Sequence, residues 1–305
     1  MPVLSPLFQT SPQRQARVAI FLSGSGSNAE KILQAQNALL AAGQACPYQV
    51  RALVTDAPEK SRAGELGRQY DLPVISEDIK AFYLSQGESR VSLLTARGQE
   101  LRNQWSDRLR QKLAPLEIDF AVFAGFVPLT NLTADFPCLN VHPGDLTYLK
   151  DGRRHLVGLH TVPIERAILE GLDCLRSSVI LAQPYTGQGE DMDSGPILGL
   201  SAPVDIDLGG ENLQSLLDIQ ARRPQRRPAG GFQDRLEEIA RHNQERLKCD
   251  GDWNVLPAVV HDFAAGRYAL DERNLLYYRL GTKFHPVETV VCNGDERELL
   301  FRSDA

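Results

Sequence analysis

The feature that most constrains this chain is a short apolar run that ends in a glycine-rich turn and then becomes helical. Residues 17–22 read RVAIFL, residues 23–28 read SGSGSN, and residues 29–43 read AEKILQAQNALLAAG. The β-branched run is typical of a strand, and the last segment is apolar at the 3.6-residue spacing of a helix. We therefore predict that strand, turn and helix form the first unit of an α/β fold.

The same alternation continues along the chain. Further strands are predicted over 50–55, 72–76, 118–126, 138–142 and 174–182, and helices over 59–70, 97–113, 163–169, 232–248 and 255–266. Strands that alternate with helices indicate a parallel sheet. We expect a Rossmann-like, mostly parallel sheet flanked by helices, followed by a C-terminal β-hairpin about Asn293 and Gly294.

The length of 305 residues fits one large domain or two small ones. We predict one α/β domain over residues 14–272, with inserted loops at about 145–157 and 205–246, and a β-hairpin extension over 273–305. The second insertion contains the run ARRPQRRPAGG at 221–231. We interpret this run as a loop or mobile insertion.

Charge and composition restrict the partners of the chain. With 39 acidic and 33 basic residues the net charge is −6, which excludes the overall basic surface of a general nucleic-acid binder. One local group of arginines is a candidate for contact with RNA phosphates, although we favour the interpretation that these side chains are solvated. The group consists of Arg222, Arg223, Arg226 and Arg227. There is no apolar stretch of about 20 residues and no secretory leader pattern, so we expect a cytoplasmic protein without a membrane or nucleic-acid partner.

Cysteine and histidine spacing gives no sign of a metal site. The five cysteines include no CxxC pair, and the six histidines show neither HxxxH nor HExxH. We expect buried or free thiols and no metal.

Two groups of residues have side chains or backbone groups suited to ligand binding or catalysis. The turn SGSGSN offers backbone N–H groups and a helix N-terminus to an anion, although a tight turn with a capping side chain explains it nearly as well. Asn140 and His142 alternate along a predicted strand and so lie on the same side at its end, where open α/β sheets bind ligands. Downstream, Asp191 and Asp193 offer a carboxylate that can pair with the imidazole. The alternative interpretation is that both acids lie in a solvated turn.

These segments, taken in order, resemble the folate-dependent formyltransferases. The motifs are SGSGSN at 23–28, AGF at 124–126, LNVHPG at 139–144, GLHT at 158–161 and MDSGPI at 192–197. The resemblance covers about residues 17–200, and residues 247–267 resemble the C-terminal helix of that family. It is closest to the branch that formylates glycinamide ribonucleotide in purine biosynthesis.

The resemblance implies transfer of a formyl group from the co-substrate 10-formyltetrahydrofolate to an amine. Asn140 and His142 fall on the positions that stabilise the tetrahedral intermediate, and Asp193 falls on the position that assists proton transfer. The phosphate of the acceptor is implied to lie on Gly24, Ser25, Gly26, Ser27 and Asn28, with help from Lys248, and its amine on Asp252. The folate is implied to lie near Phe126, Val127, Leu129, Glu190, Asp191 and Met192.

The chain also departs from the family pattern. Pro128 stands where the purine enzyme usually has a basic residue, and Ile180 stands where the family has a histidine. These differences leave open a formyltetrahydrofolate hydrolase, a formyltransferase acting on a sugar nucleotide or on methionyl-tRNA, and a non-catalytic nucleotide-binding protein of the same fold. The partners we expect are small molecules, and the protein itself is expected to be a monomer or homodimer.

Overall fold

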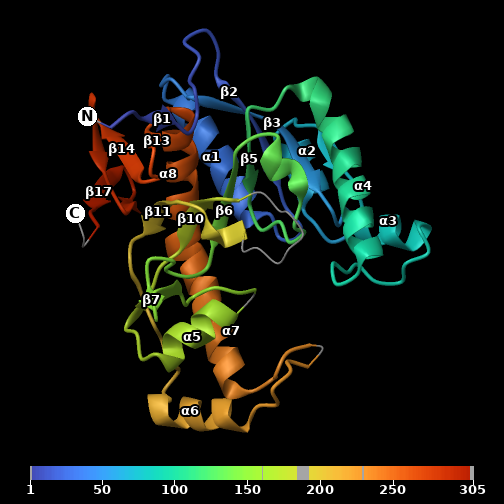
Figure 1. Cartoon of the computed structure of the whole chain (residues 1–305), viewed down its shortest axis with the longest axis vertical. Coiled ribbons are helices and arrows are strands. Elements are labelled where there is room, and N and C mark those ends of the chain that lie inside the picture. Colours follow the sequence, from blue (N-terminus) through green and yellow to red (C-terminus); the bar gives the residue numbers. More distant parts are fainter. Residues whose placement is uncertain (1, 160, 184–191, 229, 303–305) are drawn as a thin grey trace.

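The computed structural model describes residues 2–159, 161–183, 192–228 and 230–302. These residues form a nine-stranded central sheet in the order β17-β16-β11-β10-β6-β5-β2-β3-β4 (Figure 1). Its strands are β2 (Ala16–Phe21), β3 (Tyr48–Thr55), β4 (Val74–Ser76), β5 (Phe120–Phe123), β6 (Cys138–His142), β10 (Ser178–Leu181), β11 (Ile197–Ser201), β16 (Thr289–Asn293) and β17 (Glu296–Leu300). The five strands from β6 to β4 are parallel, which confirms the predicted fold class.

Helices cover both faces of the sheet because its central strands are apolar on both sides. Val18 and Ile20 of β2 pack in one core cluster with α1 and α8, and Phe21 packs in another with α3 and α4. Successive side chains of a strand point to opposite faces, so one apolar run serves two cores. The helices of these layers are α1 (Ser27–Ala41), α2 (Ala63–Gln69), α3 (Ile79–Ser85), α4 (Ala96–Leu113) and α8 (Trp253–Ala264).

Several elements differ from the predicted ones. Helix α3 was not predicted, and the strand expected over 174–182 is divided into β9 (Cys174–Leu175) and β10. The loop expected over 145–157 contains a hairpin, β7 (Leu149–Lys150) and β8 (Arg153–Arg154). Short turns complete the connections: η1 (Ala114–Leu116), η2 (Asn131–Ala134), η3 (Met192–Ser194) and η4 (Lys248–Asp252).

The insertion over 205–246 is largely helical, which confirms the helix predicted from residue 232 and corrects the loop expected over 205–231. It holds β12 (Val204–Asp205), α6 (Leu213–Arg222) and α7 (Arg235–Leu247), which pack below the sheet with α5 (Val162–Leu169) (Figure 1). Asn212 and Asp234 cap the two helices, and Leu216 and Leu236 are fully buried. The glycines and prolines that suggested a loop fall only in the connection between α6 and α7.

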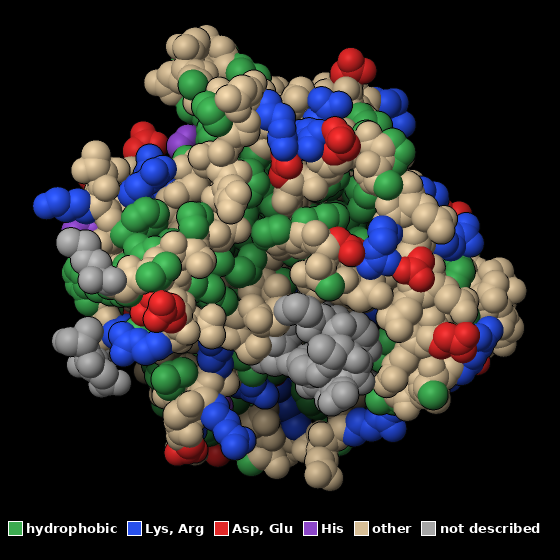
Figure 2. Space-filling view, turned by 45° about the horizontal axis from the view of Figure 1, so that its top comes forward, with side chains coloured by type: hydrophobic (Ala, Val, Ile, Leu, Met, Phe, Trp, Pro, Cys, Tyr) green, Lys and Arg blue, Asp and Glu red, His purple; other side chains and the backbone are tan. Residues whose placement is uncertain are grey.

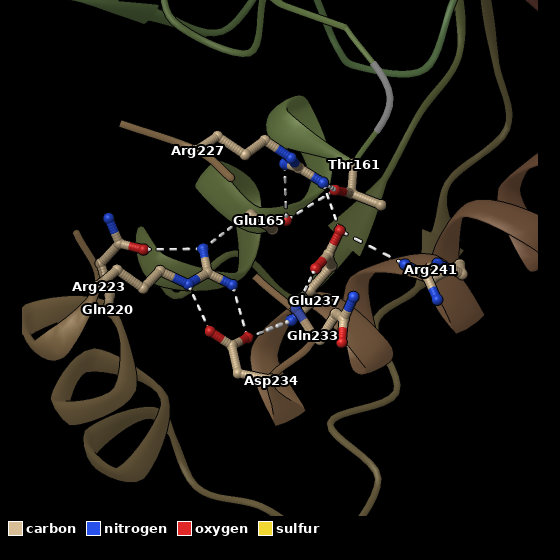
Figure 3. A network of polar contacts seen from close by, with 9 residues as sticks. All are labelled: Thr161, Glu165, Gln220, Arg223, Arg227, Gln233, Asp234, Glu237 and Arg241. Atoms are coloured by element: carbon tan, nitrogen blue, oxygen red, sulfur yellow. Dashed lines mark hydrogen bonds and ion pairs between the residues drawn. The ribbon is translucent and has the colours of Figure 1, made fainter. Parts of the chain in front are cut away.

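Two arginines of the run, Arg223 and Arg227, are paired with acidic side chains, which corrects their interpretation as solvated, whereas Arg222 and Arg226 are exposed. The Arg223 guanidinium bonds to Glu165 of α5 and, at 2.7 Å through two nitrogens, to Asp234 (Figure 3). Arg227 pairs with Glu237 of α7 and lies 3.3 Å from the Thr161 hydroxyl. Only 5% of the Arg223 side chain is exposed, so this arginine is part of the packing between helices.

The C-terminal segment forms more structure than one hairpin. The predicted hairpin about Asn293 is present as β16 and β17, and β16 runs parallel to β11, so the hairpin completes the central sheet. A second sheet has the order β1-β13-β14-β15, formed by β1 (Ser5–Pro6), β13 (Tyr268–Leu270), β14 (Leu276–Leu280) and β15 (Lys283–Pro286). The boundary expected after residue 272 falls in the turn between β13 and β14, whose Leu270 and Leu276 pair across it.

Surface charge is mixed on the face drawn in Figure 2, where basic and acidic side chains lie beside one another. Of the helices in the described ranges, none combines the length and the apolar character that crossing a membrane requires. In the same ranges there is no group of three or more His, Cys, Asp or Glu side chains placed to hold a metal ion.

Candidate active site

The glycine-rich turn carries the chain from β2 into α1. Gly26 caps the helix with a φ of 66°, in the left-handed region that favours glycine. A Cβ atom at Gly26 would also lie 2.9 Å from both Leu22 Cδ1 and Leu66 Cδ1. The first backbone N–H groups of a helix have no partner within the helix, so this turn presents them at the carboxyl end of the sheet.

A cleft of about 420 Å³ opens beside this turn. One wall is formed by Gly24, Ser25, Gly26, Ser27 and Asn28, and the facing wall by Gln244, Glu245, Lys248 and Asp252. The structure thus brings together all seven residues that the resemblance assigned to the acceptor. Lys248 forms an ion pair with Glu245, so the charge of this lysine is partly balanced at the cleft.

Asp252 lies at the inner end of the cleft and is held by two donors. Its Oδ2 accepts a hydrogen bond from Asn28 Nδ2 at 2.9 Å, and its Oδ1 accepts one from the Ser177 hydroxyl at 2.5 Å. Burial raises the pKa of Asp252, and these hydrogen bonds only partly oppose that effect. Ser177 gave no signal in the sequence, because a serine at the start of a strand is commonplace.

Asn28 also carries a polar atom without a partner. Its Oδ1 is buried and accepts no hydrogen bond within the described part of the chain. An unsatisfied buried oxygen costs about 1–3 kcal/mol, so this amide oxygen has an acceptor capacity that the described residues do not use.

Asn140 and His142 converge on Asp193, as the alternation along β6 predicts. Asn140 Nδ2 donates to Asp193 Oδ1 at 3.0 Å, and His142 Nδ1 lies 3.3 Å from Asp193 Oδ2. Burial alone would raise the pKa of Asp193, but the bonds from His142 and Asn140 and the charge of Arg154 outweigh it and lower that pKa. The aspartate is therefore ionised and can accept from both side chains.

The hydrogen bonds of His142 define where its protons are. Nε2 lies 2.8 Å from the carbonyl oxygen of Leu156, which can only accept, so Nε2 carries a hydrogen. Nδ1 faces the Asp193 carboxylate, 3.3 Å from Oδ2. Both ring nitrogens thus face oxygen acceptors, and only an imidazolium ring has a hydrogen for each of them.

Three of the residues assigned to the folate, Phe126, Val127 and Leu129, lie among the described residues. The Phe126 ring packs into the core, 5.1 Å from Phe21 and nearly parallel to Trp105. Val127 is 60% exposed, and the Leu129 carbonyl accepts a bond of 2.6 Å from Arg102. Glu190, Asp191 and the side chain of Met192 lie outside the described residues.

A larger cavity of about 890 Å³ lies on the other side of the Asp193 turn. Its lining includes Arg154, Gln183, Ser194, Gly195 and residues 133–137, together with Asn274 and Arg302 from the C-terminal segment. The lining that falls among the described residues does not include Phe126, Val127 or Leu129. The sequence did not point to Gln183 or Arg302 as residues near a ligand, whereas Arg154 lies in the inserted loop predicted over 145–157.

Solved structures share this fold. The chain is similar to phosphoribosylglycinamide formyltransferase from Coxiella burnetii, with a TM-score of 0.54 and 17% identity over 90% of this chain and 96% of that one. It is also similar to glycinamide ribonucleotide transformylase 1 from Symbiobacterium toebii, with a TM-score of 0.51 and 20% identity over 85% and 92%. The enzyme from Anaplasma phagocytophilum gives a TM-score of 0.53 and 16% identity over 90% and 99%. No protein-family model and no curated protein sequence matches the chain.

Proposed function

We propose that this protein transfers a formyl group from 10-formyltetrahydrofolate to the primary amine of a phosphorylated acceptor, with glycinamide ribonucleotide as the first candidate. The observation that carries the proposal is the contact of Asp193 with both Asn140 and His142, next to a cleft that begins at a helix N-terminus. The fold, which is that of solved glycinamide ribonucleotide formyltransferases, agrees with it.

In this proposal the acceptor occupies the 420 Å³ cleft. Its phosphate accepts hydrogen bonds from the N-terminal backbone groups of α1, with Lys248 nearby. Its amine donates to Asp252 and to the free Oδ1 of Asn28, which is the acceptor still open in that wall. This places the nucleophile at the inner end of the cleft, toward His142.

The chemical step needs stabilisation of a negative oxygen. As the amine attacks the formyl carbon, the carbonyl oxygen gains charge, and a well-placed donor to such an oxygen is worth about 3 kcal/mol. Asn140 has a second Nδ2 hydrogen for this bond, and the cationic His142 adds favourable charge. For His142 to donate as well, its Nε2 must exchange the Leu156 carbonyl for the substrate oxygen.

Collapse of the intermediate completes the transfer. The bond from the formyl carbon to the folate nitrogen breaks, the new carbon–nitrogen bond remains, and one proton moves from the amine to the folate nitrogen. Asp193 keeps His142 protonated and orients a water that carries this proton. The folate would lie beside the Asp193 turn, against Val127 and Leu129, with its tail toward the 890 Å³ cavity.

The test is a reaction of the purified protein with both substrates. We expect tetrahydrofolate and formylated acceptor in equal amounts, and a loss of at least about 10³-fold in kcat for His142→Ala with the fold retained by circular dichroism. Folate turnover without acceptor would instead identify a hydrolase. No turnover with glycinamide ribonucleotide or with a panel of sugar nucleotides and other amines would contradict the proposal.

A further inference from the structure

The segment over 145–157, longer than in the resembling family, folds back onto the candidate catalytic pair. Its hairpin turns at Asp151 and Gly152, both with positive φ, and returns the chain as β8 toward Asp193. Two groups near the end of this return path reach the pair: the Arg154 guanidinium and the Leu156 carbonyl.

Arg154 bridges the backbone of the turn that carries Asp193. Its Nη1 donates to the carbonyl oxygen of Asp193, and its Nη2 donates to that of Gly195 at 2.8 Å. The planar fork of a guanidinium fixes both acceptors in one geometry, which a lysine cannot do. The turn is also pressed against β10, since a Cβ atom at Gly195 would lie 1.9 Å from the Leu181 carbonyl oxygen.

Helix α5 fixes the backbone on both sides of Leu156, whose carbonyl contacts His142. Arg166 of α5 donates at 2.8 Å to the carbonyls of His155 and Val157, on either side of Leu156. This leaves the Leu156 carbonyl pointing at His142 Nε2, and the Leu156 side chain is buried in the lower core. The hairpin therefore contacts both members of the pair.

We propose that Arg154 is a positioning residue for the Asp193–His142 pair. It sets the backbone of the Asp193 turn and places a positive charge beside a carboxylate that must stay ionised. The inference rests on the proposed function and adds to it a residue that the sequence motifs do not contain.

The charges around the pair come from three elements. Within the described ranges, the charged groups that act on the Asp193 carboxylate are His142 from β6 and Arg154 from β8. Asp252 from η4 faces His142 from the acceptor cleft. Removal of the Arg154 charge is therefore expected to raise the pKa of Asp193, because a positive charge that lowers it is lost.

The test compares Arg154→Gln and Arg154→Lys with Arg153→Gln, a change at the exposed neighbour on the same strand. For Arg154→Gln we expect kcat to fall about 10- to 100-fold, with the KM for folate nearly unchanged, and the acid limb of the pH profile to move to higher pH. Arg154→Lys keeps the charge and loses the fork, so it should retain the position of the acid limb but not kcat. Free guanidinium should partly restore Arg154→Ala.

Each outcome of the Arg154 experiment that differs from the expected one has its own interpretation. A rise in the KM for folate alone, with an unmoved pH profile, would mean that Arg154 contacts the co-substrate and would overturn the positioning role. Equal rates for Arg154→Gln and Arg153→Gln would also overturn it. If the wild-type protein is inactive, the proposed function fails, and carbon-detected NMR titration of Asp193 still decides: its pKa must rise in folded Arg154→Gln.

Discussion

Two arginine-bearing segments of this molecule use the same side chain in different ways. In the segment 145–157 the Arg154 guanidinium donates to neutral backbone carbonyls beside the candidate catalytic pair. In the segment 205–246 Arg223 and Arg227 donate to the carboxylates of α5 and α7 and the residue before α7 (Figure 3). The acceptors differ in kind: those of Arg154 are backbone oxygens of the turn that carries Asp193, whereas those of Arg223 and Arg227 are carboxylates that join α5 to α7 and the residue before it.

The comparison separates arginine contacts that position the candidate catalytic pair from arginine contacts that stabilise the packing of helices. Changes in the first segment should alter turnover with little effect on unfolding, and changes in the second should do the reverse.

The largest effect on unfolding is expected at Arg223. Arg223→Met leaves the buried Glu165 and the adjacent Asp234 without their main cation, which should cost about 3 kcal/mol in the free energy of unfolding. The exposed Arg226 offers the control, and Arg226→Met should stay within about 0.5 kcal/mol of the wild type. Urea unfolding measures both. Equal stability of the two variants, or loss of turnover per folded molecule in Arg223→Met, would break the comparison.

A smaller effect, on turnover, is expected at Gly144. A Cβ atom there would lie 2.5 Å from the Leu156 carbonyl oxygen and 3.2 Å from His142 Nε2, so Gly144→Ala must displace the carbonyl and also crowd the imidazole itself. We expect kcat to fall by about 10-fold or more, with the fold retained. Gly64→Ala, on the exposed side of α2, should leave kcat unchanged. Unchanged kcat in Gly144→Ala would show that the Leu156 contact has no part in the reaction.

The smallest expected effect is the pH dependence of the stability that Arg223 contributes in the segment 205–246. The hydrogen bond from Arg223 lowers the pKa of Asp234 below its ordinary value of 3.8. A carboxyl group with a lowered folded-state pKa stabilises the protein above its unfolded pKa and loses that contribution as the pH falls through the lowered value. The deficit of Arg223→Met should therefore narrow as the pH falls below about 4, measured by urea unfolding. A constant deficit would assign the loss to packing on Phe232, whose ring lies 4.0 Å from the guanidinium.

Sequence periodicity was sufficient to predict those strands and helices whose position is determined by the spacing of apolar residues. The runs before the glycine turn and over 118–126 gave strands buried on both faces, and the alternation of Asn140 and His142 gave their common side. The helix α6 was missed because the glycines and prolines that follow it dominate the composition of 205–231.

Contacts made by backbone atoms gave no sequence signal. The Leu156 carbonyl reaches His142 only because a hairpin brings it back, and any residue type has a carbonyl. Arg154 was visible only as a departure in loop length. The folate assignments to Phe126, Val127 and Leu129 stay predictions, and in the structure Phe126 packs into the core.

The parallel pairing of β11 with β16 has a consequence for synthesis of the chain. Strand β11 is made before α6, α7, α8 and the strands β13 to β15, and among the described strands its outer edge pairs with the late strand β16. A nascent chain that has emerged through β11 therefore exposes an apolar strand with unpaired backbone groups until β16 has also emerged. Such an edge is a template for pairing between chains, so translation that stalls or ends before β16 should yield aggregates rather than a truncated soluble enzyme.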